Sequence, residues 1–188
     1  MTCERTALVR DAGFQTRDEN GSLTIEGYFA VFGSEYRMWE SAVETIAPEA
    51  FDDTLGDDIR ALVNHDTTLV LGRTSAGTLS LRVDERGLWG SITVNPADQD
   101  AVNLYERVKR GDVSQCSFGF DILAQDIEER EEGTVHFTLR KVQLYEVSVV
   151  TFPAYEDTSV QARKKDYDAM KQRKHDQWQA AMLAKLRK

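Results

Sequence analysis

The pattern of hydrophobic and polar positions predicts a body made mainly of β-strands. Residues 78–83 (TLSLRV) alternate, and the turn DERG separates them from residues 88–94 (LWGSITV). Two alternating runs joined by a short turn are typical of a β-hairpin. By the same pattern, further strands are predicted at residues 22–32, 58–64, 113–123, 134–139 and 142–151.

Capping residues predict two short helices between these strands. Pro48 opens the first as its first-turn proline, and Gly56 closes it. Asn95 is expected to cap the second, with Pro96 at its first position and Gly111 at its end. Short strands interrupted by few helices indicate a mainly β fold with peripheral helices (α+β). We therefore expect a closed or nearly closed β-barrel surrounded by helices.

The C-terminal segment follows a different pattern. Residues 164–188 contain no proline or glycine, and Trp178, Met182 and Leu186 recur every four residues. This spacing predicts a C-terminal helix with a partial apolar stripe.

Charge also separates the C-terminal segment from the body. The chain has a net charge of −9. Residues 161–188 carry 9 Lys/Arg and 3 Asp/Glu, whereas residues 1–160 carry 14 and 29. We therefore predict a domain at 1–160 and a basic helical tail at 161–188. The acidic body offers no broad basic face for duplex nucleic acid, and the tail is either a solvated helix or a docking segment.

Composition indicates a soluble protein of ordinary domain size. The 188 residues are 41% hydrophobic and 29% charged, which excludes wholesale disorder. The two cysteines cannot form a disulfide framework, and no run of apolar residues is long enough to cross a membrane. We expect a soluble protein of a reducing compartment that is neither exported nor membrane-spanning.

Three histidines are candidates for acid–base chemistry. His175 lies in the basic tail and His136 on the polar side of a predicted strand, so both are expected to be exposed surface residues. His65 ends the apolar run ALVNH, and a side chain at a strand end can reach a cleft. Both a catalytic and a structural role are open for His65.

The two sides of residues 113–123 differ in chemistry. Cys116 shares its side with Phe118 and Phe120, so it is predicted to be a buried, inert thiol. Ser117 lies on the other side with Gly119, which would leave room for a substrate backbone. The serine is either a nucleophile or an ordinary strand residue.

Glu146 is a carboxylate on a strand that is apolar on both sides. Burying a lone ionised carboxylate is costly, so Glu146 requires a partner. An imidazole N–H would serve, as would an arginine such as Arg73 or Arg140.

Ser117, His65 and Glu146 are the parts of a nucleophile, a base and an orienting carboxylate. No second His or Cys lies at metal-ligand spacing from His65, and no glycine-rich phosphate loop is present. No metal or cofactor is therefore predicted. Two alternatives stay open: a cysteine hydrolase using Cys116 with His65, and a non-enzymatic protein.

Several segments, taken together and in order, resemble the prohead serine proteases of tailed bacteriophages, which are capsid maturation proteases. The match runs from about residue 6 to residue 160. It is carried by GYFAVFGSEY (27–36), ETIAPEAF (44–51), NHD (64–66), LGR (71–73), VKRGDV (108–113), CSFGF (116–120) and YEVSVVTFPAY (145–155).

The resemblance also extends to the herpesvirus assemblins and implies their helix-surrounded β-barrel. It implies that His65 is the general base and Ser117 the nucleophile. The third member of the assemblin site is a histidine, and Glu146 takes that place here. For the oxyanion and substrate contacts, we predict the backbone N–H groups of Ala154 and Tyr155, together with Gly119.

The resemblance implies an endopeptidase made in the host cytoplasm that works inside the assembling procapsid. Its expected substrates are scaffolding protein or a scaffold-like segment of the major capsid protein, and the chain itself. It implies no cofactor, no contact with nucleic acid or membrane, and a homodimer as one arrangement. We hypothesise that the basic tail is a removable targeting or scaffold-binding segment. A non-catalytic capsid or scaffold protein on the same fold is the alternative.

Overall fold

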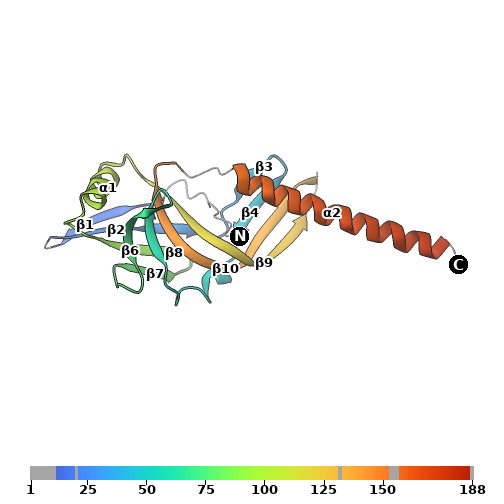
Figure 1. Ribbon diagram of the computed structural model, residues 1–188, viewed down its shortest axis with the longest axis horizontal. Helices are drawn as coiled ribbons and strands as arrows, with labels where there is room; N and C mark the ends of the chain where they lie inside the picture. The colour runs from blue at the N-terminus through green and yellow to red at the C-terminus, as the bar shows by residue number, and fades with distance from the viewer. Residues whose placement is uncertain (1–11, 20, 131–132, 153–156, 187–188) are drawn as a thin grey trace. The chain divides into compact units, whose positions relative to one another are not determined.

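The computed structural model describes residues 12–19, 21–130, 133–152 and 157–186 (Figure 1). The chain divides into two compact units, Met1–Ala154 and Tyr155–Lys188. All described strands lie in the first unit, which is mainly β, as predicted. The second unit contains one helix, α2.

The described elements of the first unit are strands with two short helical segments. In chain order they are β1 (Gln15–Glu19), β2 (Ser22–Val31), β3 (Tyr36–Trp39), β4 (Ala42–Ile46), the 3₁₀ helix η1 (Pro48–Phe51), β5 (Arg60–Val63), β6 (Asp66–Arg73), β7 (Leu79–Val83), β8 (Gly87–Val94), α1 (Gln99–Arg110), β9 (Gln115–Glu129) and β10 (Val135–Val150).

The first sheet is a four-stranded antiparallel sheet in the order β1-β2-β8-β7. The predicted hairpin is its β7–β8 pair, in which Leu79 lies opposite Ile92. β1 was not predicted, because its polar sequence QTRDE lacks an alternating apolar side.

The second sheet is built around β10, the longest strand. β9 pairs with it antiparallel along one edge, and the two run side by side in Figure 1. Along the other edge, β4 pairs in parallel with residues 135–139 and β5 with residues 146–149. β3 and β6 complete the sheet. Two separate strands were predicted here; the register shift at Lys141 marks the expected break, but the strand continues through it.

The expected closed barrel is not confirmed. The described strands form two open sheets. The four-stranded sheet begins with β1 and ends with β7, and the pairing order of the six-stranded sheet begins with β3 and ends with β6. Instead, one hydrophobic cluster joins inward side chains of both sheets, including Phe29 and Phe118. Alternating short strands suit either arrangement, and closure depends on which strands pair.

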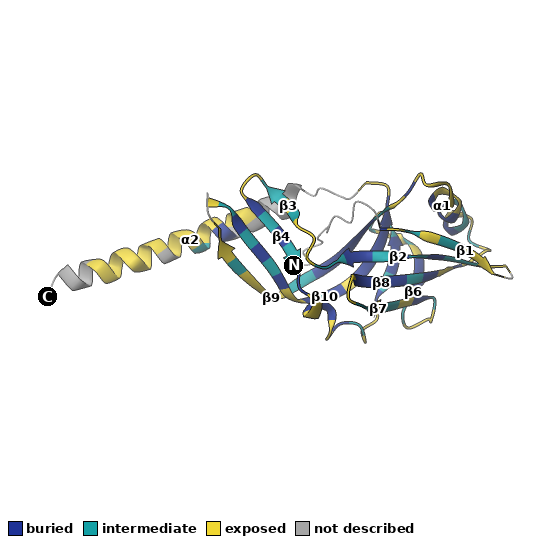
Figure 2. Cartoon of the chain, turned by 180° about the vertical axis from the view of Figure 1, so that it is seen from behind, coloured by how far each residue is buried: buried dark blue, intermediate teal, exposed yellow. Residues whose placement is uncertain are grey.

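The beginning of β9 and the end of β10 are buried on both sides (Figure 2). Phe118 and Phe120 stack with ring centroids 4.8 Å apart on the core side. The opposite side is also buried, although its residues include Ser117 and Glu146. Buried polar groups need hydrogen-bond partners or have a functional role, so this side of the two strands is a candidate functional face.

Helix α1 begins three residues later than predicted, because Asp98 rather than Asn95 caps it. The Asp98 carboxylate accepts from the backbone N–H of Asp100 at 3.0 Å and of Ala101 at 3.3 Å. Asn95 accepts from Ala97 in the preceding turn. Gly111 ends the helix with φ 86°, as predicted. The first predicted helix is only the short 3₁₀ helix η1.

Replacing Asp98 by alanine should lower the free energy of unfolding by about 1 kcal/mol, because two helix N–H groups lose their acceptor. Asp98→Asn keeps an oxygen acceptor and should retain most of that stability. Urea unfolding followed by circular dichroism measures both. An equal loss in the two variants would contradict the capping bond as the cause.

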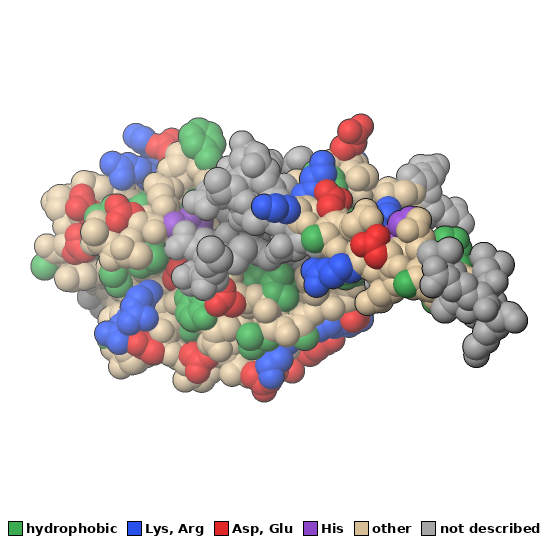
Figure 3. All heavy atoms as spheres, turned by 45° about the vertical axis from the view of Figure 1, so that its right-hand side comes forward, with side chains coloured by type: hydrophobic (Ala, Val, Ile, Leu, Met, Phe, Trp, Pro, Cys, Tyr) green, Lys and Arg blue, Asp and Glu red, His purple; other side chains and the backbone are tan. Residues whose placement is uncertain are grey.

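Helix α2 (Asp157–Leu186) confirms the C-terminal helix, starting before residue 164. Trp178 and Met182 of the expected stripe are 59% and 41% exposed, and the side chain of Leu186 lies outside the described residues. Over the described residues, no helix combines the length and apolar character needed to cross a membrane. On the face drawn in Figure 3, basic and acidic side chains are intermixed.

Candidate active site

His65 lies in a strained two-residue turn between β5 and β6. Val63 pairs with Asp66, and the two residues between them have positive φ, 50° for Asn64 and 62° for His65. Two-residue hairpin turns favour positive φ at both central positions. A histidine in this left-handed region is uncommon, and such residues cluster at functional sites. The imidazole is therefore held by a tight turn beyond the strand end.

Three hydrogen bonds fasten this turn to the end of β10. The N–H of Asn64 donates to the Val149 carbonyl at 3.0 Å, and the N–H of His65 donates to Ser148 Oγ at 3.2 Å. In return, the Asn64 side-chain oxygen accepts from the N–H of Thr151 at 2.9 Å. These bonds offset the backbone strain and determine where the imidazole lies.

Glu146 is the partner of the imidazole. Its Oε1 lies 2.7 Å from His65 Nδ1, and the two side chains are 10% and 14% exposed. An ionised carboxylate only accepts hydrogen bonds, so Nδ1 carries the proton in this pair. In the neutral imidazole, Nε2 is then the basic nitrogen. The geometry is that of a base oriented by a carboxylate.

The arginine partners considered for Glu146 are engaged elsewhere. Arg73 donates to both Asp58 oxygens, and this contact holds the pKa of the Asp58 carboxyl well below its usual range. Arg140 donates to Asp126 at 2.7 Å and to Glu49 at 3.0 Å. The imidazole, not either arginine, meets the need of the Glu146 carboxylate for a partner.

Ser117 lies directly across the β9–β10 ladder from Ser148, whose hydroxyl contacts both His65 and Glu146. Cα atoms of antiparallel partners are about 4.5–5.5 Å apart. Ser117 is 0% exposed, and its Oγ has no hydrogen-bond partner within the described part of the chain. The structure therefore brings His65 and Glu146 into contact and places Ser117 on the neighbouring strand, without a hydrogen bond from Ser117 Oγ to either of them.

Gly119 provides space for the carboxylate. It pairs with Glu146 across the ladder, and a Cβ added to it would lie 2.6 Å from Glu146 Oε1 and 3.1 Å from Cγ. Contacts under 3.0 Å force something to move. The neighbour of Gly119 in this structure is thus the Glu146 side chain, where the sequence suggested a substrate backbone.

Cys116 faces away from these groups, into the core. It is fully buried, and its Sγ lies 3.1 Å from the Tyr28 carbonyl oxygen. Burial raises the pKa of the Cys116 thiol far above its ordinary value. Because the thiolate is the nucleophilic form, a cysteine hydrolase using Cys116 has little support.

The other two histidines were both predicted to be exposed. His175 on α2 is exposed, as predicted. The prediction for His136 was wrong: its side chain is 12% exposed, and Nε2 lies 2.9 Å from Thr45 Oγ1. Pairing of β10 with β4 covers the polar side of the strand and creates this contact.

Two predicted residues are untested, and one functional candidate was missed. Ala154 and Tyr155, proposed as oxyanion donors, lie outside the described residues. Ser148 was not predicted, although it shares strand parity with Glu146 two positions away. A second polar residue on the same side of a buried strand was the available signal.

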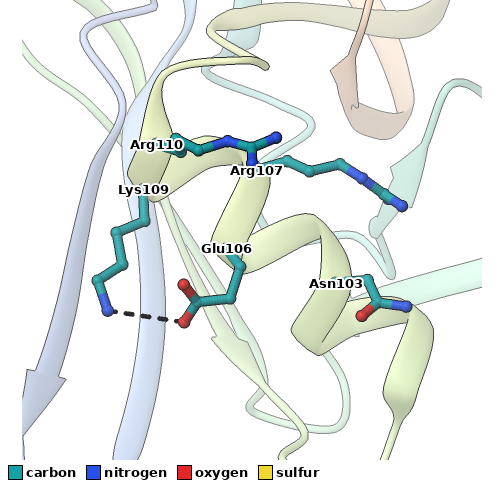
Figure 4. Close-up of a pocket in the computed structure, with 5 residues that line it drawn as sticks. All are labelled: Asn103, Glu106, Arg107, Lys109 and Arg110. Atoms are coloured by element: carbon teal, nitrogen blue, oxygen red, sulfur yellow. Dashed lines mark ion pairs between the residues drawn. The ribbon is translucent and has the colours of Figure 1, made fainter.

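A hollow of about 410 Å³ lies elsewhere, along α1, and is lined by Asn103, Glu106, Arg107, Lys109 and Arg110 (Figure 4). Lys109 pairs with Glu106 at 3.6 Å. The lining contains no hydroxyl, thiol or imidazole side chain, so it holds no Ser or Cys nucleophile with a histidine base. Over the described residues, no group of three or more His, Cys, Asp or Glu side chains is arranged to hold a metal.

Comparison with known proteins gives matches over most of the chain. The family described as caudovirus prohead serine protease matches residues 11–173, beyond residue 160, where the sequence resemblance was expected to end. The prohead protease of Enterobacteria phage HK97 is 29% identical over 143 residues, 74% of this chain and 61% of that protein. This chain therefore spans less than two thirds of that relative.

Among solved structures, the bacteriophage T4 capsid assembly protease matches 79% of this chain and 96% of its own, with 13% identity and a TM-score of 0.48.

Proposed function

This chain belongs to the caudovirus prohead serine protease family, and from this premise we propose that it is a serine endopeptidase of phage procapsid maturation. Its substrates in this proposal are scaffolding protein or a scaffold-like segment of the major capsid protein, and the chain itself. In this proposal it is made in the host cytoplasm and acts inside the assembling procapsid, and a homodimer is one arrangement of the enzyme.

The observation that carries the proposal is the contact of His65 Nδ1 with Glu146 Oε1 at 2.7 Å, beside the strand pair that holds Ser117. A serine protease needs a base near its nucleophile and a third group that orients the base. In this site, His65 is the base, Ser117 the nucleophile and Glu146 the orienting carboxylate.

In the first half of the proposed reaction, Ser117 Oγ attacks the carbonyl carbon of the scissile peptide while His65 Nε2 takes its proton. Glu146 accepts a hydrogen bond from the Nδ1–H and stabilises the imidazolium that results. The imidazolium then protonates the leaving amine as the C–N bond breaks. This step releases one product and leaves an ester between Ser117 and the other.

In the second half, water attacks the ester carbonyl while His65 takes a proton from it. That proton passes to Ser117 Oγ as the ester bond breaks and the carboxylic acid leaves. Because Ser117 is 0% exposed, a peptide carbonyl has to displace atoms that now cover the hydroxyl. Acylation therefore requires a local rearrangement that exposes the Ser117 hydroxyl.

A non-catalytic capsid or scaffold component is the competing function. A structural protein gains nothing from features that cost stability. Two non-glycine residues with positive φ, Asn64 and His65, and a buried carboxylate at Glu146 are such features. A catalytic site accounts for all of them, which favours the enzyme.

Covalent labelling tests the proposed function without knowledge of the cleavage sequence. A fluorophosphonate probe should form an adduct on Ser117 of the folded chain, identified by peptide mapping with mass spectrometry. His65→Ala should slow this labelling by about 10²- to 10⁴-fold, because the base is lost.

Two controls make the labelling result specific. The urea-unfolded chain should remain unlabelled, because its serines lack an activating base. Folded protein that forms no Ser117 adduct at saturating probe would contradict the serine mechanism and favour the non-catalytic function.

A further inference from the structure

Ser148 is a buried serine on β10 whose hydroxyl connects two parts of the candidate active site. It is 0% exposed. Its Oγ donates to Glu146 Oε2 at 2.6 Å and accepts from the backbone N–H of His65 at 3.2 Å. A hydroxyl has one proton to donate and lone pairs to accept with, so both bonds can exist together.

The first of these bonds restrains the Glu146 carboxylate. Its two oxygens have different partners, His65 Nδ1 on Oε1 and Ser148 Oγ on Oε2. Because both oxygens lie in one rigid plane, a donor held on Oε2 limits rotation of the carboxylate. The direction in which Oε1 meets the imidazole then depends on Ser148.

The second bond restrains the backbone of His65. This residue has φ 62°, in a region that costs free energy for a non-glycine residue. The bond from its N–H to Ser148 Oγ helps to hold that conformation. Ser148 therefore acts on His65 from two directions, through its main chain and through the partner of its side chain.

From these contacts we infer that Ser148 is a positioning residue, which holds the His65 imidazole in its reactive orientation without touching the substrate. This inference rests on the proposed function, because an imidazole needs a precise direction only if it transfers a proton. Ser148 is suitably placed for the role, since its partner across the ladder is Ser117.

Ser148→Ala should slow fluorophosphonate labelling of Ser117 by about 10- to 100-fold, the range expected for losing a hydrogen bond to a charged group. Ser148→Thr keeps a hydroxyl and should restore most of the rate. Ser91→Ala is the matched control, because Ser91 Oγ donates to Glu26 at 3.2 Å, between strands of the other sheet. This control should leave the labelling rate unchanged.

A second readout, the ¹⁵N NMR signals of the imidazoles, does not depend on reaction. In the native chain, His65 should show the tautomer with the proton on Nδ1. Ser148→Ala should mix the tautomers and change how the His65 signals vary with pH, whereas Ser91→Ala should not. Thermal unfolding of each variant shows whether it remains folded.

The outcomes separate the two ideas. If Ser148→Ala keeps both the native labelling rate and the native His65 signals, the positioning role is overturned. If native protein is never labelled at Ser117 but Ser148→Ala still changes the His65 signals, the proposed function fails while the orientation of His65 by Ser148 stands.

Discussion

Replacing Ser117 by alanine is expected to lower kcat for peptide cleavage by about 10⁶-fold, the loss typical of removing the nucleophile of a serine protease. No other described hydroxyl occupies the same position across the ladder from Ser148. The variant should remain folded, because Ser117 Oγ makes no hydrogen bond to any described residue. A fluorogenic peptide taken from the proposed substrates measures the loss.

Cys116→Ser is the matched control on the neighbouring residue. Its side chain faces the core, and a serine hydroxyl there can donate to the Tyr28 carbonyl in place of the thiol. We expect cleavage to continue in this variant. Cleavage that survives Ser117→Ala and is lost in Cys116→Ser would show that the nucleophile is the cysteine.

Gly119→Ala is expected to lower kcat by about 10⁴-fold, similar to the effect of changing the third member of a catalytic triad. The added methyl would lie 2.6 Å from Glu146 Oε1 and 3.2 Å from Cδ, so the carboxylate must move away from its present position. His65 would then lose its orienting partner. Steady-state kinetics should show a lower kcat with a smaller change in KM.

Two comparisons test this explanation for Gly119. Gly56→Ala should have no effect on kcat, because nothing lies within 4 Å of its added Cβ and its φ is not positive. Glu146→Gln should lower kcat to a similar degree, and the Gly119→Ala/Glu146→Gln double variant should be little worse than either single variant. Fully additive losses would contradict the view that Gly119 acts through Glu146.

Local patterns predicted the parts of the fold that depend on neighbours in the chain. Alternation identified the β7–β8 hairpin, and the apolar spacing with Gly111 identified the body and end of α1. The start of α1 was missed because Asn95 and Asp98 are both good capping residues. The sequence does not distinguish between them. In the structure, Asp98 accepts the first helix N–H groups, and Asn95 accepts from Ala97 in the turn before the helix.

Pairing between distant strands accounts for the remaining errors of fold. The break predicted between two strands near residue 140 is a bulge within β10, because β9 and β4 pair with the chain before it. The open sheets likewise follow from which strands pair. Neither property is visible in the periodicity of a single segment.

The sequence by itself determined the side of each strand on which a residue lies. It separated Ser117 from Cys116, required a partner for Glu146, and identified His65 at the end of an apolar run. Strand alternation and the cost of burying charge are local rules, so they can be read without a structure.

Only the tertiary structure decided which of these groups meet. His65 and Glu146 are 81 positions apart, and their contact depends on the register of β5 against β10. That register also brings the Ser148 hydroxyl into contact with both residues, and the register of β9 against β10 places the carboxylate beside Gly119. A one-residue shift of β10 against its neighbours would turn the Glu146 and Ser148 side chains to the opposite face, so the site exists only in this pairing.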